Sequence, residues 1–342
     1  MPTHKITKIS DAEQSQLSEF YKKVYFDRHK SLINNWRWWY RSGYSQYETL
    51  ILSLEKKVVG QAGLQPVNLN INGEKILAAW FLDFAILPEF RGKGFGKILT
   101  KKLMETCPHL ITFCNNKTLG IVRKLGWQDN SSISRLARPI NPLKFIPIVK
   151  NFNFGDVIFR NFIKRKFTFK NTVQPKEISN NYDVIEESFK KRNIKNIKNS
   201  PSIIRDEKWL YWRLMECPYK KDLYFFQYKN NFSIVHIFSN KGVKRLNVLF
   251  SYFIDQSNEM ELFNLMMHWA INNNVDLVWA IKKRDNDETL KDIFPNKFEK
   301  PLTFASWSSS QNVLRVIKDE PCNSEGIDSD IDSRMFVEQT SF

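Results

Sequence analysis

The sequence predicts an α/β fold in which helices flank a mixed, mostly antiparallel sheet. Three patterns lead to this prediction: an alternating strand that ends in Asn-Gly, an apolar run directly after it, and amphipathic helical stretches on either side. The chain has 342 residues, of which 42% are hydrophobic and 14% are aromatic. This length and composition suit two globular domains, and they exclude a globally disordered protein.

The first 48 residues are expected to supply one strand and two helices. HKITKIS (4–10) is typical of a short strand, and Asp11 can cap a helix that ends near Phe26. A second helix is expected over 31–43. Its aromatic cluster at 36–40 could cover a ligand, but aromatic side chains at helical spacing more often belong to a core. We therefore assign the cluster to the core.

Three antiparallel strands are expected between residues 49 and 87. In VNLNI (67–71) apolar residues alternate with Asn, and Asn72-Gly73 follows directly. Asn-Gly readily supplies the positive φ angles of a type I′ hairpin turn. Residues 64–71 should therefore fold back onto 75–86.

The second arm of this hairpin, Ile76 to Leu87, is almost wholly apolar. Such a run is typical of a strand that is buried on both faces. Its one charged residue is Asp83. A single carboxylate in a buried strand needs a structural partner or a chemical role.

The stretch LPEFRGKGFGKIL (87–99) places three of the chain's 12 glycines within five positions. Glycine adopts φ angles closed to other residues, so successive backbone N–H groups can point into one concavity. The concavity lies at the start of a helix expected near Phe95, where free N–H groups favour an anion. The pattern predicts a pyrophosphate site, with a ligand-free glycine turn as the alternative. It is neither a Walker loop nor the dinucleotide GxGxxG.

Residues 97–127 continue with a helix, a strand and another helix. The helix carries an apolar face, HLITFC (109–114) is a strand, and NKTLGIVRKLGW (116–127) is a helix with Gly126 at its C-cap. The expected order of elements is therefore β–α–α–β–β–β–α–β–α.

The remaining chain is expected to hold a connector, a second half and an acidic tail. Residues 141–200 are basic, with 13 Lys/Arg against 5 Asp/Glu, and they are expected to be irregular. WLYWRLMECPY (209–219) resembles WRWWYRSGYSQY (36–47), which suggests a faint internal repeat. The second copy has no glycine loop. We expect domains at 1–140, 141–200, 201–316 and 317–342.

Composition also limits the class of protein. The net charge of +16 could serve an anionic membrane surface or a nucleic acid, but no RNA-recognition signature accompanies it. No secretory leader and no 18-residue apolar run is visible, and the four cysteines match no zinc spacing. The acidic tail lacks the glycine and the glutamate of a calcium loop. We expect a cytoplasmic protein with reduced thiols and no metal.

Residues 83–127 resemble the GNAT acyl-CoA N-acyltransferases. Arg91, Gly94 and Gly96 fill the signature [Q/R]xxGxG between a strand and a helix. Asn115 and KLGW (124–127) match a later element of the family. The resemblance covers roughly residues 5–130. It implies the acyl-CoA N-acyltransferase fold with two GNAT-like halves, as in a branch associated with surface polysaccharides.

The resemblance implies acetyl-CoA or another acyl-CoA as co-substrate. The pyrophosphate would lie on the amides of the glycine loop, the pantetheine arm would follow the preceding strand, and that strand would diverge from the one at 109–114. Backbone N–H groups there could stabilise an oxyanion. The implied binding residues are Phe84, Ala85, Ile86, Arg91, Gly92, Lys93, Gly94, Phe95, Gly96, Lys97 and Asn115.

The resemblance leaves the proton transfers open. Asp83 is the candidate general base, because burial raises the pKa of a carboxylate; a structural ion pair is the alternative. Many relatives protonate the leaving thiolate with a Tyr where this sequence has Val122. Another group or solvent would then do that work, or the protein would not turn over.

The expected function is N-acyl transfer to a primary amine, such as an amino sugar of a surface-polysaccharide precursor. The acceptor could be a small molecule or linked to a nucleotide or lipid. The basic connector is a candidate for membrane contact, and no nucleic-acid partner is expected. One alternative is a Fem-type aminoacyl transferase, although the glycine loop argues against it. Another is a non-catalytic CoA-binding protein.

Overall fold

The computed structural model describes most of the chain, and it confirms the α/β fold class. The described residues are 4–26, 28–145, 161, 163–164, 167, 174–196, 201–240, 242–253, 258–283, 293–295 and 299–319. Contacts divide the chain into two compact units. Unit 1 comprises 1–132, 192–206 and 302–323, and unit 2 comprises 133–191, 207–301 and 324–342.

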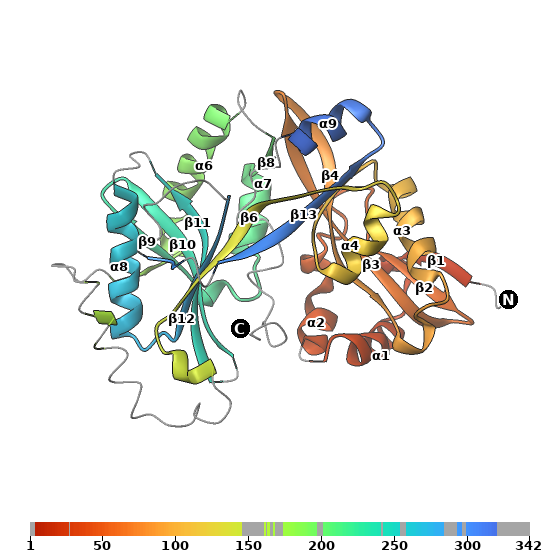
Figure 1. Cartoon of the computed structure of the whole chain (residues 1–342), viewed down its shortest axis with the longest axis horizontal. Coiled ribbons are helices and arrows are strands. Elements are labelled where there is room, and N and C mark those ends of the chain that lie inside the picture. The colour runs from red at the N-terminus through yellow and green to blue at the C-terminus, as the bar shows by residue number, and fades with distance from the viewer. Residues whose placement is uncertain are drawn as a thin grey trace. The chain divides into compact units, whose positions relative to one another are not determined.

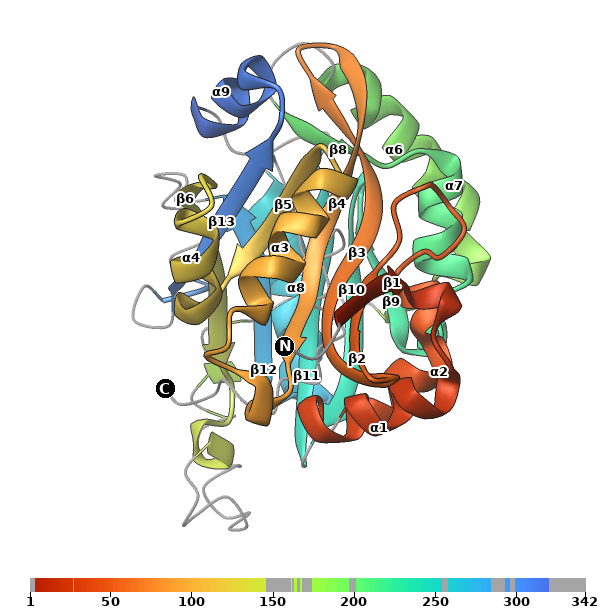
Figure 2. The ribbon, with the colours of Figure 1, turned by 90° about the vertical axis from the view of Figure 1, so that its right-hand side faces the viewer.

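Unit 1 contains all the elements expected for the first 127 residues, in the expected order (Figure 1). They are β1 (His4–Lys8), α1 (Gln14–Val24), α2 (His29–Trp39), β2 (Leu50–Leu54), β3 (Lys57–Ile71), β4 (Glu74–Ile86), α3 (Phe95–Thr106), β5 (His109–Cys114) and α4 (Asn116–Arg123). Two late segments complete the unit: β8 (Ser202–Ile204), and β13 (Lys300–Ser308) with α9 (Gln311–Asp319). Helices α3 and α4 lie across one face of the strands, where they contact β4 and β5 (Figure 2).

The sheet of unit 1 runs β1-β2-β3-β4-β5-β13, and β8 adds to β3. The hairpin between β3 and β4 has the predicted turn, with φ angles of +54° at Asn72 and +89° at Gly73. The aromatic cluster of α2 is core, as expected: Trp36 and Trp39 are buried. One detail was wrong. Asp11 lies in a short 3₁₀ turn, and Glu13 is the N-cap of α1 without a side-chain bond.

Unit 2 repeats the order of two helices, three antiparallel strands, a helix and a parallel strand. The elements are β7 (Lys176–Glu177), α6 (Tyr182–Asn196), α7 (Glu207–Leu210) with a π-helical turn (Tyr211–Met215), β9 (Leu223–Tyr228), β10 (Asn231–Asn240), β11 (Val243–Tyr252), α8 (Glu259–Asn272) and β12 (Leu277–Lys283). Helix α6 corrects the expectation that 141–200 is irregular throughout. Its alternating charges hid the few residues that it buries, Ile185 and Phe189 among them.

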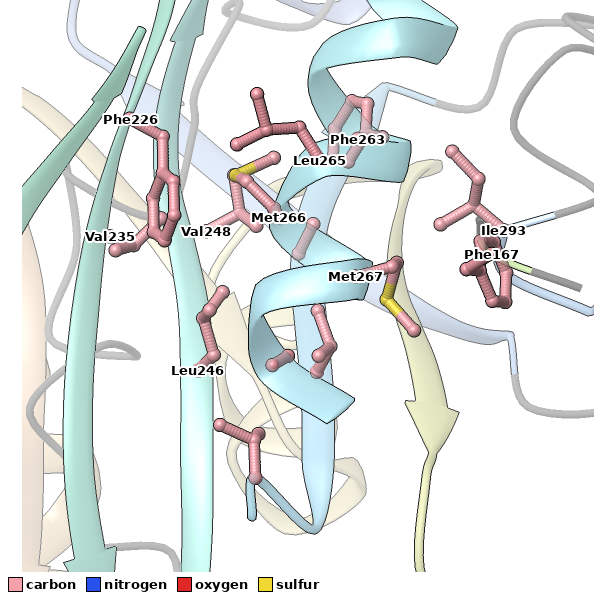
Figure 3. Packing of buried hydrophobic residues seen from close by; sticks show 14 of the residues in the cluster. Phe167, Phe226, Val235, Leu246, Val248, Phe263, Leu265, Met266, Met267 and Ile293 are labelled. Carbon is pink, nitrogen blue, oxygen red and sulfur yellow. The ribbon is translucent and has the colours of Figure 1, made fainter. Parts of the chain in front are cut away.

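The core of unit 2 lies between α8 and one face of the sheet. On α8, Met266 lies toward Phe226, Val235 and Val248 of the strands, whereas Met267 lies toward Phe167 and Ile293 (Figure 3). The repeat first seen in the sequence has a structural counterpart in α7. Trp209 and Trp212 are buried as their matches on α2 are, whereas Tyr211 is exposed.

Each unit receives one strand from a distant part of the chain. Strand β6 (Gln128–Pro139) begins directly after the helices of unit 1, yet its residues 133–139 pair with β12 of unit 2. Conversely, β13 follows the strands of unit 2 and pairs antiparallel with β5 through residues 303–308. The units defined by contacts are therefore interleaved in sequence, whereas the boundaries expected from the sequence were linear.

Strand β13 brings core side chains as well as backbone hydrogen bonds. Phe304 is 1% exposed and packs edge-on against Trp80, with 6.1 Å between the ring centroids. Phe113 of β5 stacks on the same Trp80 at 5.3 Å. Truncating a buried aromatic residue to alanine typically costs about 3–5 kcal/mol, so unit 1 depends on a strand that follows it by nearly 200 residues.

We predict that residues 1–132 alone do not unfold cooperatively, because the edge of β5 and the Trp80 ring lack their cover. Fusing residues 302–319 through a long Gly/Ser linker should restore a cooperative urea transition, followed by tryptophan fluorescence. The same fusion with Phe304→Ala is the control and should lose about 3 kcal/mol. An equally cooperative transition for residues 1–132 alone would contradict the dependence on β13.

Candidate functional site

The glycine loop between β4 and α3 has the backbone conformation of an anion-binding turn. Gly92 and Gly94 have φ angles of +75° and +84°. A Cβ atom at either glycine would meet nothing within 4 Å. Backbone conformation, rather than lack of space, therefore requires glycine at these two positions.

The start of α3 leaves N–H groups without an acceptor inside the helix. Gly94 is the N-cap, with no side-chain cap, and its carbonyl accepts the first helical bond from the Ile98 N–H at 3.1 Å. The N–H groups of residues 95–97 precede that bond and have no intrahelical acceptor. With the positive end of the helix dipole, they can bind an anion.

The third glycine of the loop has a different role. Gly96 lies in α3, and a Cβ built on it would come within 3.4 Å of the Phe84 ring of β4. This distance is an ordinary van der Waals contact, so space does not require glycine at position 96. Backbone conformation requires glycine only at positions 92 and 94 of the loop.

The basic residues of the loop lie at its exposed surface. Arg91 donates from Nε to the carbonyl of Ile86 at 3.0 Å, which ties the loop to the end of β4. The Lys93 ammonium lies 5.3 Å from the centroid of the Phe90 ring. Lys97, on the first turn of α3, is exposed. The three residues give the loop a positive potential around the free N–H groups.

Strands β4 and β5 diverge after two paired positions. They pair in parallel only at Ala79 with Leu110 and at Trp80 with Ile111. Beyond this point β4 follows β3, and β5 follows β13. The N–H of Leu87 bonds to Val59 on β3, whereas the carbonyl of Ile86 accepts from Arg91, so Ile86 points its backbone groups away from β3.

Asp83 forms the bulge in β4 where this divergence begins. The φ angle of Asp83 is +48°, and the pairing with β3 shifts register opposite it, between Gln61 and Gly63. The side chain of Asp83 is 1% exposed and forms an ion pair with Arg28, 2.8 Å from Oδ1. The indole of Trp39 donates to Oδ2 at 2.8 Å, and the Tyr40 hydroxyl donates to it at 3.2 Å.

The backbone of Asp83 is held as firmly as its side chain. Its carbonyl accepts from the Tyr25 hydroxyl at 2.5 Å and from the amide of Gln61 at 3.3 Å. Tyr21 donates to the same Gln61 at 2.8 Å. Burial raises the pKa of Tyr21 and Tyr40 well above the usual value of a phenol, so both hydroxyls stay protonated. We call these seven residues the Asp83 cluster: Tyr21, Tyr25, Arg28, Trp39, Tyr40, Gln61 and Asp83.

The sequence pointed to Asp83 but missed the rest of the cluster. Arg28 lies just beyond the expected end of the first helix, and nothing in its spacing marks it. The available signal was the single carboxylate in a buried strand, which needs a cation and donors nearby. The aromatic residues of α2 supply the donors, and thus they serve the core and the bulge together.

The other expected site residues lie around the end of β5. Asn115 is the N-cap of α4, and its side chain accepts from the Thr118 N–H at 2.9 Å. Val122, at the position where many relatives have a Tyr, is buried and has no proton to donate. Cys114 ends β5, and burial raises the pKa of its thiol to about 12. At neutral pH this thiol is protonated and unsuited to act as a nucleophile.

Two further observations concern the whole described chain. Among the described residues, no helix is both long enough and apolar enough to span a bilayer. Nor do the described His, Cys, Asp and Glu side chains gather in a group of three or more that could hold a metal ion.

Comparisons with known proteins agree with the fold. Residues 5–128 match the family model "Acetyltransferase (GNAT) domain". A GCN5-related N-acetyltransferase from Kribbella flavida shares the fold, with 12% sequence identity and a TM-score of 0.59; the match covers 89% of this chain and 71% of that chain. A second GCN5-related N-acetyltransferase, from Anabaena variabilis, has 13% sequence identity and a TM-score of 0.56; the match covers 89% of this chain and 72% of that chain. The N-myristoyltransferase of Saccharomyces cerevisiae with bound myristoyl-CoA is also similar, with 12% sequence identity and a TM-score of 0.58; the match covers 90% of this chain and 78% of that chain. No curated protein matches in sequence.

We predict that the ion pair of Asp83 is essential for stability. Asp83→Asn or Arg28→Met should each lower the free energy of unfolding by about 3–5 kcal/mol, because each leaves a buried group without its partner. The double variant should lose less than the sum of the two. Lys102→Met, which removes an exposed ion pair with Glu105, should change it by less than about 1 kcal/mol. Urea denaturation measures all four, and an Asp83→Asn variant as stable as the parent would contradict this role.

Proposed function

Residues 5–128 form an acetyltransferase domain of the GNAT family, and from this premise we propose that the chain transfers an acyl group from acyl-CoA to a primary amine. Domain and fold indicate an acyltransferase. The observation that carries the proposal is the glycine loop, because its two positive φ angles precede a helix whose first N–H groups are free.

The donor is proposed to bind along the loop and the end of β4. Its pyrophosphate would lie on the N–H groups of residues 91–97, and Arg91, Lys93 and Lys97 would balance the negative charge. Its pantetheine arm would follow the backbone of 84–86, on the side of β4 that β3 leaves free. Asn115 would contribute indirectly, because it caps the N-terminus of α4 at the end of β5. The divergence of β4 and β5 supports this assignment, because it frees backbone groups where the thioester would lie.

The transfer we propose is direct. The amine attacks the thioester carbon, a C–N bond forms, the C–S bond breaks, and the amine proton passes to a base. Backbone N–H groups at the divergence would stabilise the developing oxyanion. The protonated thiol of Cys114 argues against an acyl-cysteine intermediate. Since Val122 cannot donate a proton, we propose that solvent protonates the leaving thiolate.

Asp83 is a candidate for two roles in this reaction. As a general base it would accept the amine proton, directly or through water. As a positioning residue it would fix the bulge and the helices around it. The ion pair with Arg28 and the donors on Oδ2 favour positioning, because they stabilise the charged form and occupy both oxygens. Base catalysis remains a prediction, which the pH profile of an Asp83→Asn variant can test.

For the acceptor we propose an amino sugar of a surface-polysaccharide precursor. Support comes from the sequence resemblance to a two-halved branch and from unit 2, which repeats the order of elements without a glycine loop and is therefore free for a second ligand. The runner-up is a Fem-type aminoacyl transferase, against which the glycine loop argues. A non-catalytic CoA-binding protein is the remaining alternative. It is suggested by Val122, which stands where many relatives have the Tyr that protonates the leaving thiolate.

We predict that Gly94→Ala weakens acetyl-CoA binding about tenfold, the equivalent of about 1.4 kcal/mol. An alanine at a φ angle of +84° is strained, so the loop would shift and its N–H groups would diverge. Gly120→Ala, on the exposed face of α4, is the matched control and should leave binding unchanged. Calorimetric titration with acetyl-CoA measures both. Equal affinities of parent and Gly94→Ala would contradict the pyrophosphate assignment.

Turnover separates the three functions. We expect acetyl-CoA with a UDP-linked amino sugar to release free CoA, detected by a thiol reagent, faster than acetyl-CoA alone. Release of an amino acid from aminoacyl-tRNA to a peptide amine would instead support the Fem-type function. Tight binding of acetyl-CoA without release of CoA across a panel of amines would support the binding protein.

A further inference from the structure

Unit 2 carries two arginines on the face of its sheet that points away from α8. Along β12 the side chains alternate, and Val278 and Ala280 pack into the core under α8. Their neighbours Leu277 and Ile281 therefore point to the opposite face. In the register of the sheet Arg245 of β11 lies beside Leu277, and Arg135 of β6 lies beside Ile281. Residues paired across strands share a face, so both arginines lie on the face opposite α8.

Arg245 is buried, and its Nε atom has no hydrogen-bond partner among the described residues. The residue is 5% exposed, and its Nε atom is buried and makes no hydrogen bond. Within the described part of the chain, no carboxylate forms an ion pair with Arg245 or Arg135. Arg138, which alternates to the other face of β6, shows the usual arrangement: its guanidinium donates to the Ile293 carbonyl and lies over the Phe167 ring.

The electrostatics of the pair is unfavourable without an anion. Burial lowers the pKa of both arginines, and the charge of Arg135 lowers the pKa of Arg245 further. Buried charges in proteins are almost always paired, since desolvating an ion costs several kcal/mol. Among the described residues no carboxylate balances either guanidinium, so a bound anion would supply the missing counter-charge.

We propose that Arg135 and Arg245 bind a phosphate group of a ligand on this face of unit 2. Two guanidinium groups carry a charge of +2 and planar donors that match the oxygens and the charge of a phosphate dianion better than those of a single carboxylate. In the register between the two arginines lies Trp279, whose side chain is 3% exposed and belongs to the packed interior. If the proposed function holds, this phosphate belongs to the amine acceptor.

A stability measurement tests the missing counter-charge. Replacing Arg245 with methionine keeps most of its volume and removes one of two repelling charges. We expect Arg245→Met, and likewise Arg135→Met, to raise the melting temperature in phosphate-free buffer. Lys221→Met, which removes an exposed charge in the same unit, should leave it unchanged. A lower melting temperature for Arg245→Met would overturn the proposal, because it would show that the charge of Arg245 stabilises the fold without a ligand.

A binding measurement tests the ligand. Pyrophosphate is titrated calorimetrically in the presence of saturating CoA, which fills any site at the glycine loop. We expect Arg245→Met and Arg135→Met to raise the Kd for pyrophosphate at least tenfold, and Lys221→Met to leave it unchanged. Equal Kd values in parent and Arg245→Met would overturn the proposal.

The design keeps this proposal separate from the function proposed for unit 1. Affinity for CoA itself is titrated in the same variants and should not change in Arg245→Met. If CoA fails to bind at all, the donor assignment fails, yet the difference in pyrophosphate binding between parent and Arg245→Met still decides the phosphate site.

Two binding experiments identify the source of the phosphate. UDP-glucosamine is compared with vesicles of phosphatidylcholine that contain phosphatidic acid. Binding of UDP-glucosamine that Arg245→Met removes assigns a nucleotide-linked ligand. Vesicle binding removed by the same variant assigns a lipid headgroup. If Arg245→Met reduces neither interaction, the phosphate comes from neither source. If the Kd for pyrophosphate is unchanged as well, the site itself is overturned.

Discussion

The ion pair between Arg28 and Asp83 is the constraint on which the first unit depends. A non-glycine residue at a φ angle of +48° inside a strand is strained, and such strain persists only where the surroundings hold it. Here the surroundings are an arginine, an indole and three hydroxyl or amide donors from α1, α2 and β3. The bulge that they hold lies just beyond Trp80, the last residue of β4 that pairs with β5. One buried carboxylate therefore joins the packing of two helices to the opening of the sheet.

The glycine loop depends on the same strand, because it begins where β4 ends. Arg91 donates from Nε to the carbonyl of Ile86, which ties the loop to the end of β4. In unit 2 the pairing of β10 with β11 also shifts register, between Ile234 and Val235, one strand before the parallel pair. The irregularity of the sheet is thus repeated, whereas the glycines are not.

Local patterns in the sequence predicted most of the elements of unit 1, because Asn72-Gly73, the glycine loop and the apolar faces each determine their structure within a few residues. They could not predict which strand lies beside β5. That neighbour is β13, nearly 200 residues later, and its alternation is weak. For the site the same division holds. Loop residues are contiguous and were found, whereas Arg28 and Gln61 reach Asp83 only through tertiary packing.

The two units treat buried charge in opposite ways, and this difference is informative. In unit 1 the carboxylate of Asp83 is neutralised within the protein, which suits a rigid scaffold that must hold its shape before any ligand arrives. In unit 2 Arg245 is desolvated, the charge of Arg135 lowers its pKa further, and its Nε has no acceptor among the described residues. An unpaired charge of this kind lowers stability and gives the scaffold nothing in return. Binding of the proposed anion would offset this cost.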